Sequence, residues 1–234
     1  MRQNKPAILI TAEVDELLLK QIISKEINAD VIPFIKTEIN QTKKTQQQIE
    51  NVITLNATVI FTSKNAIEAV SEYLQNKKPN WKIYCIGNTT RILVEKYFGK
   101  ESIASIADDA TALAKKTIAD DLTKEVYLFC GDKRRDELPE LLLQNNISVN
   151  EIEVYTTTIL HHTIEKGYGG ILFFSPSAVE GFFKNNKVNE NTILFAIGTT
   201  TANEIKRFSK NKIIVSNKAD KKNLIEKVIE YFQC

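Results

Sequence analysis

The chain has 234 residues, of which 43% are hydrophobic and 26% charged, a composition typical of globular proteins and long enough for one large domain or two smaller ones. Its 31 Lys and Arg residues almost balance 29 Asp and Glu residues, so the net charge of +2 does not favour nucleic acid as a partner. No apolar run approaches the roughly 20 residues that a membrane-spanning helix needs, so we expect no membrane segment.

The cysteines and histidines argue against a disulfide framework and a metal site. Cys85, Cys130 and Cys234 are an odd number without paired spacing, and the first two lie in strand-like runs that favour small buried thiols. His161 and His162 are adjacent, so their side chains point apart on an extended strand. The opening segment MRQNKPAILIT leads directly into a predicted strand without the pattern of a signal peptide. We therefore expect a cytoplasmic, metal-free protein.

Short apolar runs alternate with segments of helical period, the pattern of βα units on a parallel sheet. The sequence predicts strands at residues 7–11, 30–34, 58–61, 82–86, 126–130, 151–157, 170–174, 192–197 and 212–215, with a short one near 102–106. Helices with one apolar face are predicted at residues 17–27, 110–118, 138–143 and 224–232. The predicted fold class is α/β.

The turns that lead from strand to helix occur twice along the chain. VIFTSKNAIEAV is matched by ILFFSPSAVEGF, and IYCIGNTTR by LFAIGTTTA. Ser63 and Ser175 are 112 positions apart, Gly87 and Gly198 are 111 apart, and Asp109 with its helix is matched by Asp220. Matches in one order at one offset indicate a duplicated half. The repetition predicts two similar lobes that hold one ligand between them.

The chain divides into four blocks, at residues 7–34, 58–118, 126–155 and 171–232. Blocks two and four are the duplicates, whereas blocks one and three each read as strand, helix, strand. Periodicity leaves open whether block one joins block two or block four. The junction segments 34–38 and 154–158 have no turn signal, which makes them candidate linkers.

Four repeated turns are candidates for ligand binding, because ligands of open parallel sheets bind beyond the carboxyl ends of the strands. Each turn offers hydroxyl groups and backbone N–H groups at the positive end of a helix, an environment that suits anionic oxygens. An alternative is that Ser63, Thr89, Ser177 and Thr200 are plain helix N-caps. The candidate residues are Thr62, Ser63, Lys64, Asn65, Gly87, Asn88, Thr89, Ser175, Pro176, Ser177, Ala178, Gly198, Thr199, Thr200 and Thr201.

A fifth candidate turn begins at Gly131 and continues as Asp-Lys-Arg-Arg after the strand at 126–130. Gly131 permits close approach to the backbone, and Lys133 and Arg134 suit a carboxylate or a phosphate. A solvated charge run is the alternative. The turn lacks the spacing of a phosphate-binding loop, and the sequence contains no Gly-x-Gly-x-x-Gly, so a nucleotide is not indicated.

At these turns the chain resembles the uroporphyrinogen-III synthase family. The resemblance is carried by FTSKNAIEAV, IGNTTRILVEKYFG, the helix start at 109–116, CGDKRRDELPELL, EVYTT, FFSPSAVEGF and AIGTTTANEI, in the family's order and spacing. It implies two lobes, each a parallel sheet flanked by helices and joined by a two-stranded linker at 34–38 and 154–158. Domain one would comprise residues 1–34 and 159–234, and domain two residues 38–154.

The resemblance also implies the reaction. The substrate would be hydroxymethylbilane, a linear tetrapyrrole with eight carboxylate arms, which loses its hydroxyl and closes with ring D inverted. Such a reaction depends on positioning and needs no cofactor, and we expect the enzyme to act as a monomer.

Tyr155, in EVYTT, would donate a proton to the departing hydroxyl, or alternatively would only fill space at the linker. Two other functions remain open from the residues alone: a non-catalytic sensor or carrier of a small anionic ligand, and a homologue that has lost activity.

Overall fold

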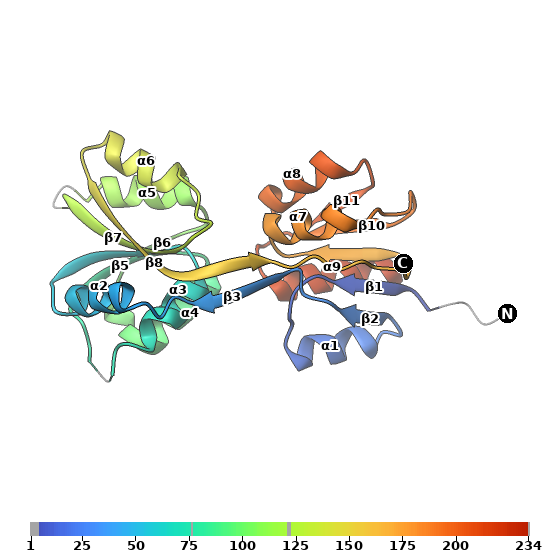
Figure 1. The fold of residues 1–234 in the computed structure, drawn as a ribbon, viewed down its shortest axis with the longest axis horizontal. Coiled ribbons are helices and arrows are strands. Elements are labelled where there is room, and N and C mark those ends of the chain that lie inside the picture. Colours follow the sequence, from blue (N-terminus) through green and yellow to red (C-terminus); the bar gives the residue numbers. More distant parts are fainter. Residues whose placement is uncertain (1–4, 76, 121–122, 234) are drawn as a thin grey trace. The chain divides into compact units, whose positions relative to one another are not determined.

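The computed structural model describes residues 5–75, 77–120 and 123–233, so residues 1–4 of the predicted opening segment and Cys234 lie outside it. The chain forms two compact units, shown in Figure 1. The terminal unit comprises Met1–Lys36 and Thr158–Cys234, and the central unit comprises Thr37–Thr157. The chain passes from one unit to the other within β3 and again within β8, which are neighbours in one sheet.

The terminal unit contains a five-stranded sheet of order β11-β10-β9-β1-β2, with parallel pairing between neighbours. Helices α7 and α8 cover one face and helices α1 and α9 the other (Figure 1). Its elements are β1 (Ala7–Ile10), α1 (Glu16–Ile23), β2 (Asn28–Val31), β9 (Gly170–Phe173), α7 (Pro176–Asn185), β10 (Ile193–Ala196), α8 (Thr199–Phe208), β11 (Ile213–Val215) and α9 (Lys221–Gln233).

The central unit contains a six-stranded sheet of order β3-β8-β7-β4-β5-β6, in which the strands from β8 to β6 pair in parallel. Helices α2, α3 and α4 cover one face and helices α5 and α6 the other. Its elements are β3 (Ile35–Ile39), α2 (Lys43–Ile53), β4 (Ala57–Phe61), α3 (Lys64–Ser71), β5 (Trp81–Ile86), α4 (Asn88–Phe98), the 3-10 helix η1 (Lys100–Ser102), β6 (Ile103–Ala107), α5 (Ala110–Ile118), β7 (Glu125–Gly131), α6 (Glu137–Gln144) and β8 (Ser148–Ile159).

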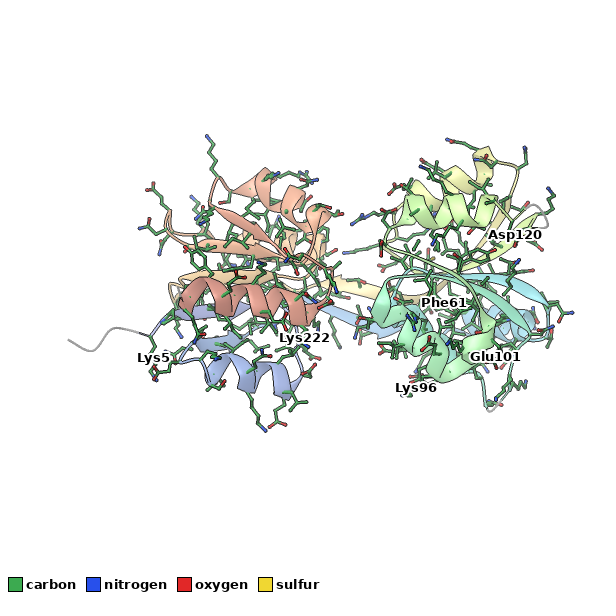
Figure 2. All side chains as sticks on the ribbon, turned by 180° about the vertical axis from the view of Figure 1, so that it is seen from behind. Lys5, Phe61, Lys96, Glu101, Asp120 and Lys222 are labelled. Carbon is green, nitrogen blue, oxygen red and sulfur yellow. The ribbon has the colours of Figure 1, made fainter. Side chains whose placement is uncertain are left out.

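Alternation along the strands divides each unit into two apolar layers, because successive side chains point to opposite faces of a sheet. In β4, Val59 and Phe61 pack beneath α3 and α4, whereas Ile60 packs beneath α5 and α6. Phe61 is fully buried and stacks against Phe129 with ring centroids 5.4 Å apart. Figure 2 places it inside the central unit, between sheet and helices. Helices therefore cover both faces of each sheet, and the backbone that remains accessible to a ligand lies at the strand ends.

The two units share one topology. The segment β4-α3-β5-α4-β6-α5 of the central unit has the same order as β9-α7-β10-α8-β11-α9 of the terminal unit. The strand–helix–strand segments β7-α6-β8 and β1-α1-β2 then occupy equivalent places beside them. Block one thus joins the sheet of block four, and block three joins that of block two. The fold is the α/β class predicted from the sequence, with two similar units of parallel sheet flanked by helices.

The structure corrects three local predictions. Helix α2 was not predicted, because its sequence KKTQQQIENVI is mostly polar and buries only Thr45, Ile49, Val52 and Ile53. Helix α1 ends at Ile23 rather than at residue 27, since Glu26 has φ 58° and turns the chain toward β2. The strand predicted at 30–34 begins earlier, at Asn28, and ends at Val31. Among the described residues, no helix is both long and apolar enough to cross a membrane.

Candidate functional site

The candidate turns lie at the carboxyl ends of parallel strands, so those of each unit share one edge of its sheet. In the central unit this edge collects the turns after β4, β5 and β7. In the terminal unit it collects the turns after β9 and β10. Each edge places several helix N-termini together, and their partial positive charges favour anionic groups.

The turn after β4 is organised by Ser63, the N-cap of α3. Its Oγ accepts a hydrogen bond from the backbone N–H of Asn65 at 3.2 Å. Ser63 remains partly exposed, as do Thr62 and Asn65, and Lys64 is exposed. The turn therefore presents a hydroxyl group and an ammonium group to solvent beside a helix N-terminus.

The turn after β5 differs, because its N-cap is Gly87, whose φ of 78° lies in the left-handed region that glycine adopts readily. Gly87 provides no side-chain acceptor, so the first N–H groups of α4, which begins at Asn88, lack a cap. Thr89 in this first turn is exposed, whereas Thr90 is buried. Uncapped N–H groups in an accessible turn are suited to a carboxylate.

The basic run after β7 is engaged within the unit. The guanidinium of Arg134 forms ion pairs with Asp136 and with Glu151 of β8, and its side chain is 26% exposed. Lys133 is exposed and has no ion-pair partner within the described parts of the chain. Lys133 can therefore bind an anion without breaking an ion pair. Arg134, by contrast, also anchors the turn to β8.

Tyr155 lies next to this turn, opposite Gly131 in the β7–β8 register. Its ring packs against the apolar layer under α2, α3 and α4, and its hydroxyl interacts with the Ser63 side chain. Burial raises the pKa of the phenol above its ordinary value, and the interaction with Ser63 lowers it to a smaller extent. Tyr155 is therefore a protonated, partly buried donor held at the same edge as the Ser63 turn.

In the terminal unit, Ser175 caps α7 by accepting from the N–H of Ala178 at 3.1 Å, and Pro176 occupies the first turn. Gly198 precedes α8 and provides no side-chain cap. Thr199 and Thr200 are exposed, whereas Thr201 is 3% exposed and belongs to the core side of α8. The terminal unit thus repeats the pattern of one capped and one uncapped helix N-terminus.

Of the four hydroxyl residues considered as helix N-caps, Ser63 caps its helix, whereas Thr89, Ser177 and Thr200 do not. Ser175 rather than Ser177 caps α7, and Gly87 and Gly198 stand at the N-cap positions next to Thr89 and Thr200. The third repeated element consists of Asp109 before α5 and Asp220 before α9, and both cap their helices. Asp109 accepts from Ala112 N–H at 2.7 Å, and Asp220 accepts from Asn223 N–H at 2.8 Å.

Two contacts of this edge were not predicted from the sequence. Asp132 accepts a hydrogen bond from Thr157 N–H at 2.8 Å, and its own N–H donates to the Tyr155 carbonyl at 3.2 Å. The second is the interaction between Ser63, in the turn after β4, and Tyr155 of β8, two strands that are not neighbours. An aspartate directly after Gly131 is the only sequence signal for the first, and the second required the strand order.

The chain matches the family model described as uroporphyrinogen-III synthase HemD over residues 17–226. It is similar in fold to a mutant uroporphyrinogen III synthase from Thermus thermophilus, at 12% identity and a TM-score of 0.67, covering 97% of this chain and 98% of that one. It is also similar to uroporphyrinogen-III synthetase from Helicobacter pylori, at 16% identity and a TM-score of 0.66, covering 97% and 100%. The chain belongs to the uroporphyrinogen-III synthase family, cyclising lyases of tetrapyrrole biosynthesis.

Proposed function

We propose that the chain cyclises hydroxymethylbilane with inversion of ring D by holding the chain of pyrroles folded while Tyr155 protonates the departing hydroxyl. The observation that carries this proposal is the Tyr155 phenol, held beside the Ser63 turn at the strand edge of the central unit. A phenol whose pKa lies above its ordinary value near 10 is protonated at neutral pH, so it has the proton that a general acid must donate. Loss of water then leaves an electrophile that the substituted carbon of ring D attacks.

The carboxylates of the substrate are bound by the turns. We assign binding to the uncapped N–H groups at the starts of α4 and α8, to the hydroxyl groups of Thr62, Ser63, Thr89, Ser175, Ser177, Thr199 and Thr200, and to Lys64, Lys133 and Arg134. Thr201, Pro176 and Ala178 are excluded, because Thr201 is buried, proline has no N–H group and the Ala178 N–H donates to Ser175. The N–H groups of Asn65 and Gly87 are likewise engaged, with Ser63 and with the Ala107 carbonyl. Each hydrogen bond to a substrate carboxylate contributes on the order of 1 kcal/mol net. Positioning can lower the activation barrier by roughly 7–11 kcal/mol in well-oriented reactions. Because no single bond dominates, we expect this contribution to be distributed over many contacts.

The residues support a cytoplasmic monomer that needs no metal or cofactor. Burial raises the pKa of Cys85 to about 11 and that of Cys130 to about 12, so both thiols are inert core groups, in keeping with a reducing compartment. The exposed large apolar side chains come from several separate segments, which is usual for a monomer. They are Leu17, Ile23, Leu55, Ile92, Leu143 and Phe208.

Freshly made hydroxymethylbilane, incubated with the protein in the presence of a chelator and then oxidised for isomer separation, tests this function. The expected product is predominantly the type III isomer, whereas buffer alone gives the symmetric type I isomer. An isomer ratio equal to that of the buffer control, from protein shown to be folded by circular dichroism, would identify a homologue without activity.

A further inference from the structure

The ring of Tyr155 packs directly against Gly131. A Cβ atom added to Gly131 would lie 2.4 Å from Cε2 of Tyr155, 2.5 Å from Cζ and 2.9 Å from the phenol oxygen. Real Cβ atoms essentially never approach other heavy atoms within 3.0 Å, so the ring occupies the space that a side chain at position 131 would need. The contact reaches the hydroxyl end of the tyrosine, the part that carries its chemistry.

The backbone of Gly131 does not itself require glycine. Within the described residues, the glycines with positive φ are Gly87 and Gly99. An alanine at position 131 would therefore not be opposed by a left-handed backbone, and the three nearest atoms that its Cβ would meet all belong to the Tyr155 side chain. That ring is the movable partner, so the expected consequence of a methyl group at 131 is a displaced phenol in a folded protein.

Two further features hold the tyrosine backbone against this turn. The β7–β8 register shifts between Cys130 and Gly131, which brings Gly131 opposite Tyr155. Asp132 then bonds to the β8 backbone directly after the tyrosine side chain, through its N–H to the Tyr155 carbonyl and through its carboxylate to Thr157 N–H. Ring and backbone are thus fixed by two consecutive residues of one turn.

We propose that Gly131 and Asp132 are positioning residues that aim the Tyr155 hydroxyl, with Gly131 acting through the absence of a side chain rather than by admitting substrate to its backbone. The proposal rests on the proposed role of Tyr155, and its test includes a readout that needs no substrate. Gly131→Ala should move the ring away from the turn, and a reactive group misplaced by about 1 Å can cost a hundredfold in rate.

The direct readout is fluorine NMR of protein carrying 3-fluorotyrosine at position 155, titrated without substrate. Gly131→Ala should change the fluorine chemical shift and bring the phenol pKa back toward that of a free fluorotyrosine, because the displaced ring is less buried. Gly167→Ala is the matched control, since a Cβ there meets only the Asn189 side chain at 3.5 Å. An unchanged shift and pKa in Gly131→Ala would overturn the proposal.

Turnover gives the second readout. Gly131→Ala should lose about a hundredfold in the wild-type protein but less than about twofold when added to Tyr155→Phe, because it acts through the hydroxyl. Equal losses in both backgrounds would mean a contact of Gly131 with substrate and would contradict the proposal. A silent Tyr155→Phe together with an altered fluorine spectrum would sustain the positioning and reject the acid role.

Asp132 supplies a variant that leaves the glycine intact. Asp132→Ala removes the acceptor of Thr157 N–H and should lower turnover about tenfold, whereas Asp132→Asn keeps an oxygen acceptor and should restore most of it. Equal turnover of the two variants would exclude Asp132 from the positioning turn.

Discussion

The equivalent strand ends of the two units have the same topology and carry different chemistry. In the terminal unit, β1 is followed by fully buried Thr11, whose Oγ1 donates to the Leu172 carbonyl at 2.7 Å. The chain that returns past it carries Phe34, which is buried against Phe182 with ring centroids 5.4 Å apart. In the central unit, β7 ends at Gly131 and the returning strand carries Tyr155. The terminal edge is closed by core packing, whereas the central edge holds a phenol.

This difference assigns separate tasks to the duplicated parts. The turns before α3, α4, α7 and α8 recur in both units and offer the same kind of candidate group for binding anions. The candidate proton donor occurs only in the central unit, where the shifted register and Gly131 make room for it. In the proposed function, duplication therefore accounts for the binding of a substrate with many carboxylates, and local divergence accounts for the chemistry.

The largest expected effect comes from removing the central hydroxyl. Tyr155→Phe should lower turnover about a hundredfold while the melting temperature stays close to that of the wild type, because the ring and its packing remain. Tyr127→Phe, also against the same apolar layer, is the control and should leave turnover unchanged. Full turnover in Tyr155→Phe would leave catalysis to positioning alone.

A paired experiment compares the two capping serines. Ser63→Ala and Ser175→Ala each remove an N-cap and should each lower the free energy of unfolding by about 1 kcal/mol. Turnover should fall further in Ser63→Ala, by roughly an additional tenfold, because that side chain also interacts with the Tyr155 hydroxyl. Both variants should remain measurably active. Equal losses of turnover would show that the interaction of Ser63 with Tyr155 has no part in the reaction.

The smallest effect is expected at the closed terminal edge. Thr11→Val keeps the shape of the side chain and removes its hydrogen bond to Leu172, so unfolding by urea should report a loss of about 1 kcal/mol. Turnover should be unchanged, since Thr11 is fully buried and its hydroxyl bonds to a backbone carbonyl of the core. A loss of turnover larger than the loss of stability explains would mean that the terminal edge also takes part in the chemistry.

The fold class and the candidate turns were predictable because their signals are local and repeated. Strand-like runs and N-cap residues are read within a few positions, and the offset between the halves identifies the turns that matter. Helix α2 was missed because few of its residues are apolar. The contacts of the Tyr155 side chain were not predicted for a different reason. Ser63, Gly131 and Tyr155 lie on three separate strands or turns, and only the strand order brings them together.

The most direct test of the account is the pH dependence of kcat/KM with 3-fluorotyrosine at position 155. A proton donor must be protonated, so activity should decline as pH rises through the phenol pKa, which burial places above the ordinary value near 10. Fluorination lowers the phenol pKa, and the account predicts that the alkaline limb moves to lower pH by the same amount. Fluorotyrosine at position 127 should leave it in place. An alkaline limb that stays fixed with fluorotyrosine at 155 would contradict the claim that Tyr155 donates the proton.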